Sequence, residues 1–445
     1  MASLIKHLPD KIKNLAKTNP AAIRYIMDGL LAVSAINIAS SNYSLFAVRL
    51  GADDFQLSLV QFLPHFFTLL VLIPGGLFMD TLSNKRRIVI VMMLVVMFGF
   101  FLCAASPFLN AYSIQFFLGS LALTGSAVAL YNIAWQSFFP GVVTVNTRNR
   151  VLTLRTRVTL IISMMIPLLV GAILTNIKNV ENKIIAHQAF FAGAVFLLIF
   201  AILNFKRIRK IRKSAAEIHA QSAVLQNTQT PKRINLSEFK SAGLSLLKNK
   251  KFIMFTVTAL FFHMTWHFDW TLYFIGQVHY LRMNELQLGF VNLGAALIQL
   301  LTLRFWSRKN ERLGAAPPFT FGILGLSLCP LFMTISVSSP YIIGPYLFIL
   351  LHTIAHIPFC TITLNLYQCI LLAVDKEKNV SFYISVFSSL LCLSNSVMPV
   401  AGVALYHSLG GDLNGFRYTL IIIFILRIIA ALLWFIWWKR RAVSA

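Results

Sequence analysis

The chain alternates long apolar stretches with short polar loops. Twelve of the stretches are long enough to cross a lipid bilayer as α-helices, each of which needs about 20 mainly apolar residues. Their expected limits are 24–47, 56–79, 88–108, 113–139, 152–175, 185–205, 252–276, 286–306, 316–338, 343–373, 380–405 and 416–438. The pattern predicts an all-α integral membrane protein with twelve transmembrane helices.

Composition and charge support this interpretation and add an orientation. The 445 residues are 58% hydrophobic with a mean hydropathy of +0.74, which is too apolar for a soluble protein. The net charge of +25 comes from Lys and Arg between the apolar stretches, whereas a nucleic-acid-binding domain would gather them on a folded face. With the N-terminus inside, 30 of the 39 basic residues fall in cytoplasmic segments and four fall outside. We expect a multi-pass cell-membrane protein with both termini in the cytoplasm.

One loop divides the chain into two halves. Segment 206–251 is long, polar and basic, and it separates six predicted spans from six. We expect three parts: an N-terminal six-helix bundle with its cytoplasmic leading segment (1–205), a cytoplasmic basic linker (206–251), and a C-terminal six-helix bundle with a short cytoplasmic tail (252–445). The linker is expected to contact anionic membrane lipid.

The two halves also contain a short internal repeat. Residues 55-FQLSLV-60 match 286-LQLGFV-291 with an offset of 231 residues. The same offset places Asp80 opposite Glu311, and each of these acids stands among basic residues at the end of a predicted span. Because the register predicts this second feature independently, we interpret the halves as a duplication.

The segment around Asp80, 75-GGLFMDTLSNKRR-87, resembles the signature loop of the major facilitator superfamily of secondary transporters. The residues that match in kind are Gly76, Phe78, Asp80, Lys85 and Arg86, whereas Thr81 and Ser83 replace the usual Arg and Gly. In the second copy, Glu311, Arg312, Leu313 and Gly314 match and Ser307 replaces the first Gly. The resemblance, together with the twelve spans, implies two pseudo-symmetric bundles that alternate access to a central cavity.

The resemblance also implies a gate at the signature loop. An acid at the tip of a span can accept hydrogen bonds from basic groups or from a helix N-terminus while the two halves stay close. We expect Asp80, Arg86, Glu311 and Arg312 to form such a gating latch. The alternative is that the basic residues only enforce topology.

Polar residues inside spans are costly in lipid and therefore mark the cavity or another polar contact. The seventh predicted span is the richest in them. His263, Trp266, His267 and Trp270 share one helical stripe, with Asp269 beside it. An acid next to imidazoles and indoles suits proton binding, so Asp269, His263 and His267 are candidates for proton coupling. The alternative is a fixed structural pair between Asp269 and a histidine.

Other spans supply further cavity candidates. In the tenth span, His352, His356 and Thr363 share a stripe beside Pro358, and the two histidines, with those of span seven, could form a metal site. In the first and fourth spans the candidates are Asn37, Ser41, Asn132 and Gln136. Trp266 and Trp270 are expected to stack on an aromatic or cationic substrate.

Asp28, Arg155 and the cysteines have simpler expected roles. Asp28 is expected either to reach the headgroups or to pair with Arg24, and Arg155 to reach the headgroups unless it faces the cavity and binds an anion. All five cysteines lie in apolar stretches without metal-type spacing, so packing is their expected role.

We found no phosphate-binding GxxxxGK[ST], nucleophile elbow or HExxH pattern in the sequence, so we expect neither an enzyme nor a cofactor. The sequence predicts a monomeric secondary transporter for a small-to-medium organic solute, proton-coupled, with export slightly favoured over uptake. Three alternatives remain: a flippase for a lipid-linked substrate, a transporter of a metal or metal chelate using the histidine pairs, and a non-transporting receptor or scaffold.

Overall fold

The computed structural model describes residues 20–81, 85–139, 145–208, 246, 248–373 and 380–443. This part of the chain is helical and contains no strand. Its elements are α3 (Pro20–Ser40), α4 (Tyr43–Arg49), α5 (Asp54–Thr81), α6 (Lys85–Ala105), η1 (Ser106–Tyr112), α7 (Ser113–Phe138), α8 (Val145–Thr175), α9 (Val180–Lys206), α12 (Lys250–His267), α13 (Trp270–Ile275), η3 (Gly276–Tyr280), α14 (Glu285–Leu313), α15 (Ala316–Val337), α16 (Gly344–Ala355), α17 (Cys360–Ala373), α18 (Val380–Ser408) and α19 (Leu413–Val443).

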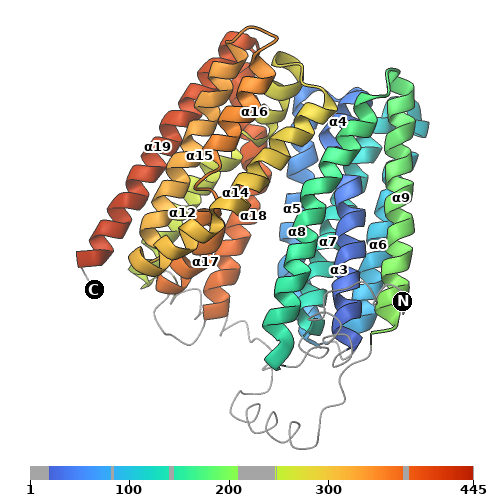
Figure 1. Cartoon of the computed structure of the whole chain (residues 1–445), viewed down its shortest axis with the longest axis horizontal. Coiled ribbons are helices and arrows are strands. Elements are labelled where there is room, and N and C mark those ends of the chain that lie inside the picture. Colours follow the sequence, from blue (N-terminus) through green and yellow to red (C-terminus); the bar gives the residue numbers. More distant parts are fainter. Residues whose placement is uncertain are drawn as a thin grey trace, which may run out of the picture.

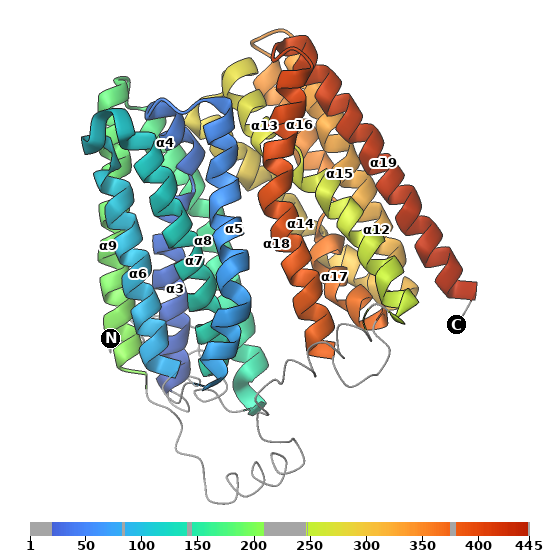
Figure 2. The ribbon, with the colours of Figure 1, turned by 180° about the vertical axis from the view of Figure 1, so that it is seen from behind.

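The helices form two groups that stand side by side (Figures 1 and 2). Helices α3 to α9 make one group, the N-terminal bundle, and α12 to α19 make the other, the C-terminal bundle. When α3 with α4, α12 with α13, and α16 with α17 are each counted as one interrupted helix, the described residues contain twelve long helical segments. The all-α fold predicted from the sequence is therefore confirmed. The predicted linker lies mostly outside the described residues.

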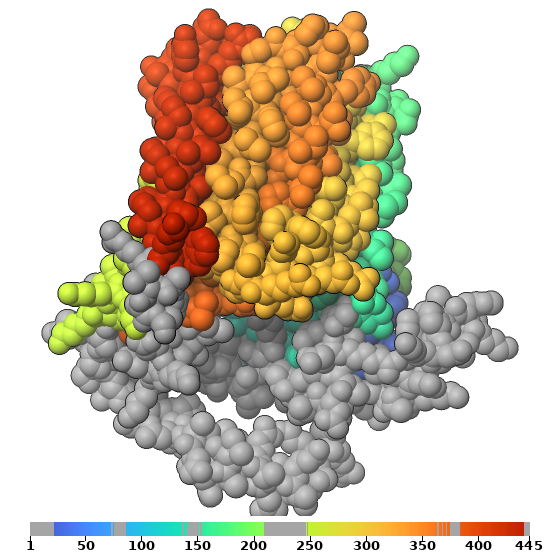
Figure 3. All heavy atoms as spheres, turned by 60° about the vertical axis from the view of Figure 1, so that its left-hand side comes forward, coloured from blue at the N-terminus to red at the C-terminus, as the bar shows by residue number. Residues whose placement is uncertain are grey.

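Ten stretches within the described residues are long and apolar enough to cross a membrane. One of them, Arg86–Trp135, covers both α6 and α7. Large apolar side chains such as Phe98, Phe101 and Phe196 are exposed along the helices, which is the surface that lipid tails cover. On the face in Figure 3, α19 and α15 pack together as one wall of the C-terminal bundle.

Three of the predicted spans are interrupted, and only for the tenth did the sequence indicate this, through Pro358, which is expected to kink its helix. The first breaks at Ser41 and Asn42, between α3 and α4, because Ser and Asn side chains compete for backbone hydrogen bonds. The tenth breaks at Pro358, which lacks an N–H group and clashes with a continuing helix. The carbonyl oxygen of Ile357, freed at this break, accepts hydrogen bonds from Thr302 Oγ1 and Trp306 Nε1, each at 2.9 Å.

The third interruption separates α12 from α13 at Phe268 and Asp269. Helix α18 approaches this break closely at Gly402. A methyl group at Gly402 would lie 1.9 Å from the Phe268 carbonyl oxygen, so only glycine fits there without movement of the backbone. The break is therefore packed tightly into the C-terminal bundle.

The internal repeat has a structural counterpart at the start of α5 and α14. The backbone nitrogen of Gln56 donates to Asp53 Oδ1 at 2.7 Å, and the backbone nitrogen of Asp53 donates to Gln56 Oε1 at 3.1 Å. Asn284 and Gln287, each 231 residues further on, make the same reciprocal bonds at 2.8 and 2.9 Å. This capping box satisfies backbone N–H groups that a helix start leaves without partners.

The two bundles meet mainly through two helix pairs, α5 with α18 and α8 with α14. The helices approach closely where glycines replace side chains: a methyl group at Gly171 of α8 would lie 2.4 Å from the carbonyl oxygen of Glu285, and one at Gly289 of α14 would lie 3.1 Å from the Cα atom of Leu168. These contacts lie at the end of the molecule opposite to the start of α3 and the end of α19 (Figure 1). We call this end the contact end.

Candidate functional site

A carboxylate bridges the two bundles at the contact end. Glu285, in the first turn of α14, accepts charge-assisted hydrogen bonds from Arg49 Nη2 and from Lys183 Nζ. Arg49 also donates to His187 of α9, and the backbone nitrogen of Leu286 donates to Thr175 Oγ1 at 2.9 Å. The Arg49 and Glu285 side chains are each only 9% exposed, so solvent screens their attraction weakly.

The equivalent position in the repeat makes a reciprocal contact. Asp54 lies 231 residues before Glu285 and begins α5. Its carboxylate lies 3.3 Å from His407 Nε2 and 3.9 Å from His279 Nδ1, both in the C-terminal bundle. Each bundle thus places one acid against basic or imidazole groups of the other. We call the Glu285 and Asp54 contacts together the contact-end lock.

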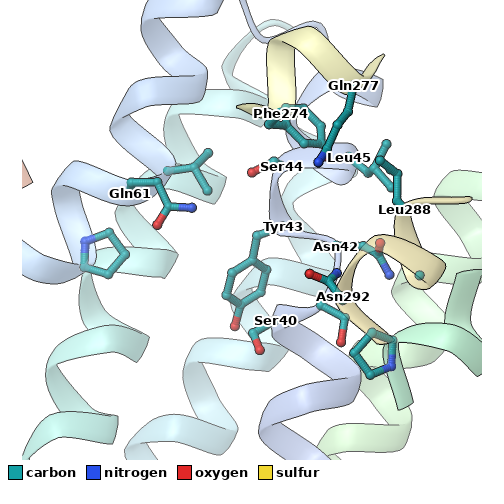
Figure 4. Close-up of a pocket in the computed structure, with 15 residues that line it drawn as sticks. Ser40, Asn42, Tyr43, Ser44, Leu45, Gln61, Phe274, Gln277, Leu288 and Asn292 are labelled. Carbon is teal, nitrogen blue, oxygen red and sulfur yellow. The ribbon is translucent and has the colours of Figure 1, made fainter. Parts of the chain in front are cut away.

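Just inside the lock, a cavity of about 360 Å³ lies between the bundles. It is lined by the α3–α4 break, α5, α8, α13 with η3, and α14. Polar side chains from both bundles surround it: Asn42, Tyr43, Gln61, Gln277 and Asn292 are labelled in Figure 4. None of its lining residues carries a formal charge. The site therefore offers neutral hydrogen-bonding groups to a ligand of organic-solute size.

One lining residue, Asn42, has a side-chain hydrogen-bond donor that is not used by any described residue. Asn42 stands in the break between α3 and α4, and its Nδ2 has no hydrogen-bond partner among the described residues. A buried amide without a partner costs free energy, which a ligand acceptor would recover. Asn42 therefore brings a buried donor, unpartnered within the described part of the chain, to the lining of the cavity.

A buried ion pair lies behind the cavity, in the C-terminal bundle. Arg427 Nη2 of α19 donates to Asp269 Oδ1 at 2.6 Å, and the two side chains are 1% and 0% exposed. Asp269 occupies the break between α12 and α13, and its Oδ2 has no hydrogen-bond partner among the described residues. An isolated buried charge would be far more costly than this pair.

The interruptions in neighbouring helices explain why an arginine fits there. Arg427 Nη1 donates to the carbonyl oxygen of Leu326 at 2.6 Å, and the normal helical partner of that oxygen would be residue 330, which is proline and has no N–H. Arg427 also donates to the carbonyl oxygens of Thr265 and Trp266, at 3.2 and 3.0 Å, on the last turn before the α12–α13 break. The arginine thus holds two irregular helices together.

The short helix α13 connects the ion pair to the cavity. Asp269 directly precedes it, and Phe274 of α13 and Gln277 of η3 line the cavity. Trp270, its first residue, has its ring centroid 6.1 Å from that of His65 in α5 of the other bundle. A change in the charge of Asp269 therefore has a direct structural route to the cavity and to the bundle interface.

The two histidine pairs predicted from the sequence lie in different surroundings. His263 is buried with no hydrogen-bond partner for its ring nitrogens among the described residues, and His267 Nδ1 is 2.9 Å from Ser394 Oγ. His352 and His356 lie instead beside Cys329, in the one group of possible metal ligands among the described residues. The structure therefore does not gather the four histidines into one site, and the partner of Asp269 is Arg427 rather than a histidine.

The remaining cavity candidates are placed as follows. Ser41 lines the cavity, whereas Asn37 donates to Ser163 Oγ of α8 at 3.2 Å in a contact between helices. Trp266 packs against Phe359, with ring centroids 5.5 Å apart, and Asn132 is exposed. The side chains of Gln136 and Thr363 lie outside the described part of the chain.

Asp28 lies in a buried polar cluster at the opposite end of the N-terminal bundle, and its contacts there differ from the expected ones. Its Oδ2 accepts hydrogen bonds from Trp135 Nε1 at 3.1 Å and Tyr131 Oη at 3.3 Å, and the carboxylate is fully buried. Arg155 does not extend away: its guanidinium stacks 3.7 Å from the Trp135 ring centroid. The expected pairing of Asp28 with Arg24 is wrong, because Arg24 donates to the carbonyl oxygen of Arg207.

The latch predicted at the signature loop stays a prediction. Glu311 and Arg312 are exposed and Arg86 is half-buried, and the side chain of Asp80 lies outside the described part of the chain.

Sequence reasoning missed two residues that the structure brings forward. Arg427 is a lone arginine in the middle of the last apolar stretch, which is a signal for a buried partner. Glu285 directly precedes the second copy of the repeat, and Asp54, its counterpart, directly precedes the first.

The fold and site define a polytopic transporter with a cavity between two related bundles. The sequence profile described as Major Facilitator Superfamily matches residues 28–368, and the chain belongs to this family. It is a secondary transporter of the membrane and not an enzyme. A search of curated proteins found no match.

Solved structures of other transporters share the fold. A bacterial homologue of the iron transporter ferroportin, in an inward-facing state, is 12% identical with a TM-score of 0.69, covering 94% of this chain and 98% of that one. The nucleoside transporter NupG is 12% identical with a TM-score of 0.67, covering 94% and 99%. A D-xylose–proton symporter is 12% identical with a TM-score of 0.66, covering 93% and 96%. At these identities the likeness concerns the fold alone.

Proposed function

We propose that the protein is a proton-coupled transporter of a neutral, hydrogen-bonding organic solute of small to medium size. The observation that carries the proposal is the buried Asp269–Arg427 pair at the start of the helix that lines the cavity. The cavity supplies amides, hydroxyls and aromatic rings without charge, which suits a polar organic molecule better than an ion. A lipid-linked substrate would favour a cavity that is apolar in one half and charged in the other.

Coupling would follow from the charge of Asp269. Protonation neutralises the carboxylate and weakens its attraction to Arg427, while the three carbonyl contacts hold the arginine in place. Helix α13 can then shift relative to α19, which moves Phe274 and Gln277 at the cavity. Solute and proton would each bias the same structural element, as coupled transport requires.

Alternating access would require the contact-end lock to break. We propose that the contact end faces the outside of the cell and both termini face the cytoplasm, because basic residues concentrate in the segments at the other end. The structure is then closed to the outside by the Glu285 and Asp54 contacts. The proposed location is the cell membrane, the proposed state is a monomer in contact with lipid, and export is slightly favoured as the direction.

The test is transport by the purified protein in proteoliposomes, using a solute chosen by its ability to raise the thermal stability of the protein. Wild-type protein should accumulate the solute when a pH gradient is imposed, and Asp269→Asn should lose the effect of the gradient while it still exchanges solute across the membrane. Glu181→Gln, which changes an exposed acid, is the matched control and should behave as wild type. Accumulation by Asp269→Asn that still follows the pH gradient would exclude Asp269 as the coupling group.

A further inference from the structure

A group of metal-ligating side chains lies inside the C-terminal bundle, away from the residues that line the cavity. The sulfur of Cys329 in α15 and one ring nitrogen each from His352 and His356, at the end of α16, all lie within 4.8 Å of one another. Cys329 is 2% exposed. The three residues come together because α15 packs directly against α16.

The orientation of the histidines suits ligation. His356 Nδ1 lies 2.8 Å from the carbonyl oxygen of His352 and, since a carbonyl only accepts, Nδ1 carries the proton. The lone pair of His356 is therefore on Nε2. Metal-binding histidines are commonly oriented in this way, by one ring N–H that donates to a backbone carbonyl. His352 Nδ1 is buried and has no hydrogen-bond partner among the described residues, so this ring also has an uncommitted nitrogen.

The distances between the three candidate ligand atoms are close to those in a metal site. A cation with bonds of about 2.0 to 2.3 Å to three ligands in one plane needs ligand atoms about 3.5 to 3.8 Å apart. Small side-chain rotations reach this from the observed separations. The Tyr273 hydroxyl also has no hydrogen-bond partner among the described residues. The centroid of its ring is 6.2 Å from that of His352, so this hydroxyl could form part of the polar environment of a bound cation.

The net charge of the three ligands distinguishes monovalent from divalent cations. A thiolate with two neutral imidazoles has one negative charge, so a monovalent cation makes the buried complex neutral, whereas a divalent one leaves an uncompensated charge in a low-dielectric interior. The acid nearby in the fold, Asp269, is already paired with Arg427. Thiolate and imidazole are ligands that soft metals prefer. We propose that Cys329, His352 and His356 bind one soft monovalent cation of the Cu(I) class in the wall of the C-terminal bundle.

The test uses the purified full chain in detergent and chloride-free buffer, with Ag(I) as a redox-inert monovalent probe and Zn(II) as the divalent comparison. Bound metal is measured by mass spectrometry after desalting in the presence of a competing chelator. Wild-type protein should retain about one Ag(I) per chain and become more resistant to heat. Cys329→Ser and His356→Gln should each bind Ag(I) at least tenfold more weakly. No transport assay is involved, so the result is independent of the proposed function.

Cys103→Ser is the matched control, because Cys103 is a buried cysteine in the other bundle. It should retain Ag(I) as wild type does. Equal retention by the Cys329 and Cys103 variants, or retention of Zn(II) in place of Ag(I), would overturn the assignment. If Cys329→Ser does not fold, the His356→Gln variant decides, since its cysteines are intact and only the proposed ligand set is broken.

Discussion

Replacing Asp269 with leucine should destabilise the protein by about 3 to 5 kcal/mol, because the change leaves Arg427 buried without its counter-ion. The three carbonyl groups around the guanidinium offer dipoles but no charge, so they compensate only in part. The measurement is the fraction of protein that stays monodisperse after heating in detergent. We expect the midpoint to fall by several degrees.

The double variant Asp269→Leu with Arg427→Met separates charge burial from lost packing. Replacing both partners removes the uncompensated charge, so the double variant should recover part of the lost stability. Recovery should be incomplete, since the Leu326 carbonyl loses the donor that replaces the missing N–H of Pro330. Equal midpoints for the single and double variants would show that the buried charge is not the origin of the loss.

Breaking the contact-end lock should shift the protein toward a state that is open at this end. In Glu285→Ala the bonds from Arg49 and Lys183 are lost, and truncating one partner of such a buried charge pair costs about 2 kcal/mol or more. That corresponds to about a thirtyfold change in the ratio of closed to open molecules. The measurement is the distance distribution between spin labels at positions 181 and 338, which are exposed at the contact end on different bundles.

Wild-type protein should give mainly one short distance, and Glu285→Ala should add a longer one as a major population. Asp412→Asn is the control, because Asp412 is an exposed acid at the same end that caps the backbone nitrogen of Gly415 within its own bundle. An unchanged distribution in Glu285→Ala would mean that the close packing of Gly171 and Gly289 keeps the bundles together without the ion pairs.

Much of the fold was predictable because membrane helices are specified locally. The length and apolarity of each stretch determine whether it can cross a bilayer, so the two sets of six spans could be read along the chain. The repeat at residues 55–60 and 286–291 could also be recognised in the sequence. The capping boxes beside it are local, since each joins residues only three positions apart. The interruptions at Asn42 and Asp269 were not predicted, because each short polar segment lies between apolar residues that together have the length of one span.

The candidate site depended on contacts that local patterns do not specify. Sequence reasoning placed Asp269 inside a span as a candidate for proton coupling, and the structure shows that it is buried, but its partner Arg427 is 158 residues away. Likewise, Glu285 reaches Arg49 across 236 residues, and the cavity combines side chains from five separate parts of the chain. By itself the sequence determined which segments enter the membrane, through their apolarity and length. Only the tertiary structure decided which polar groups pair, because pairing depends on how helices distant in sequence pack against one another.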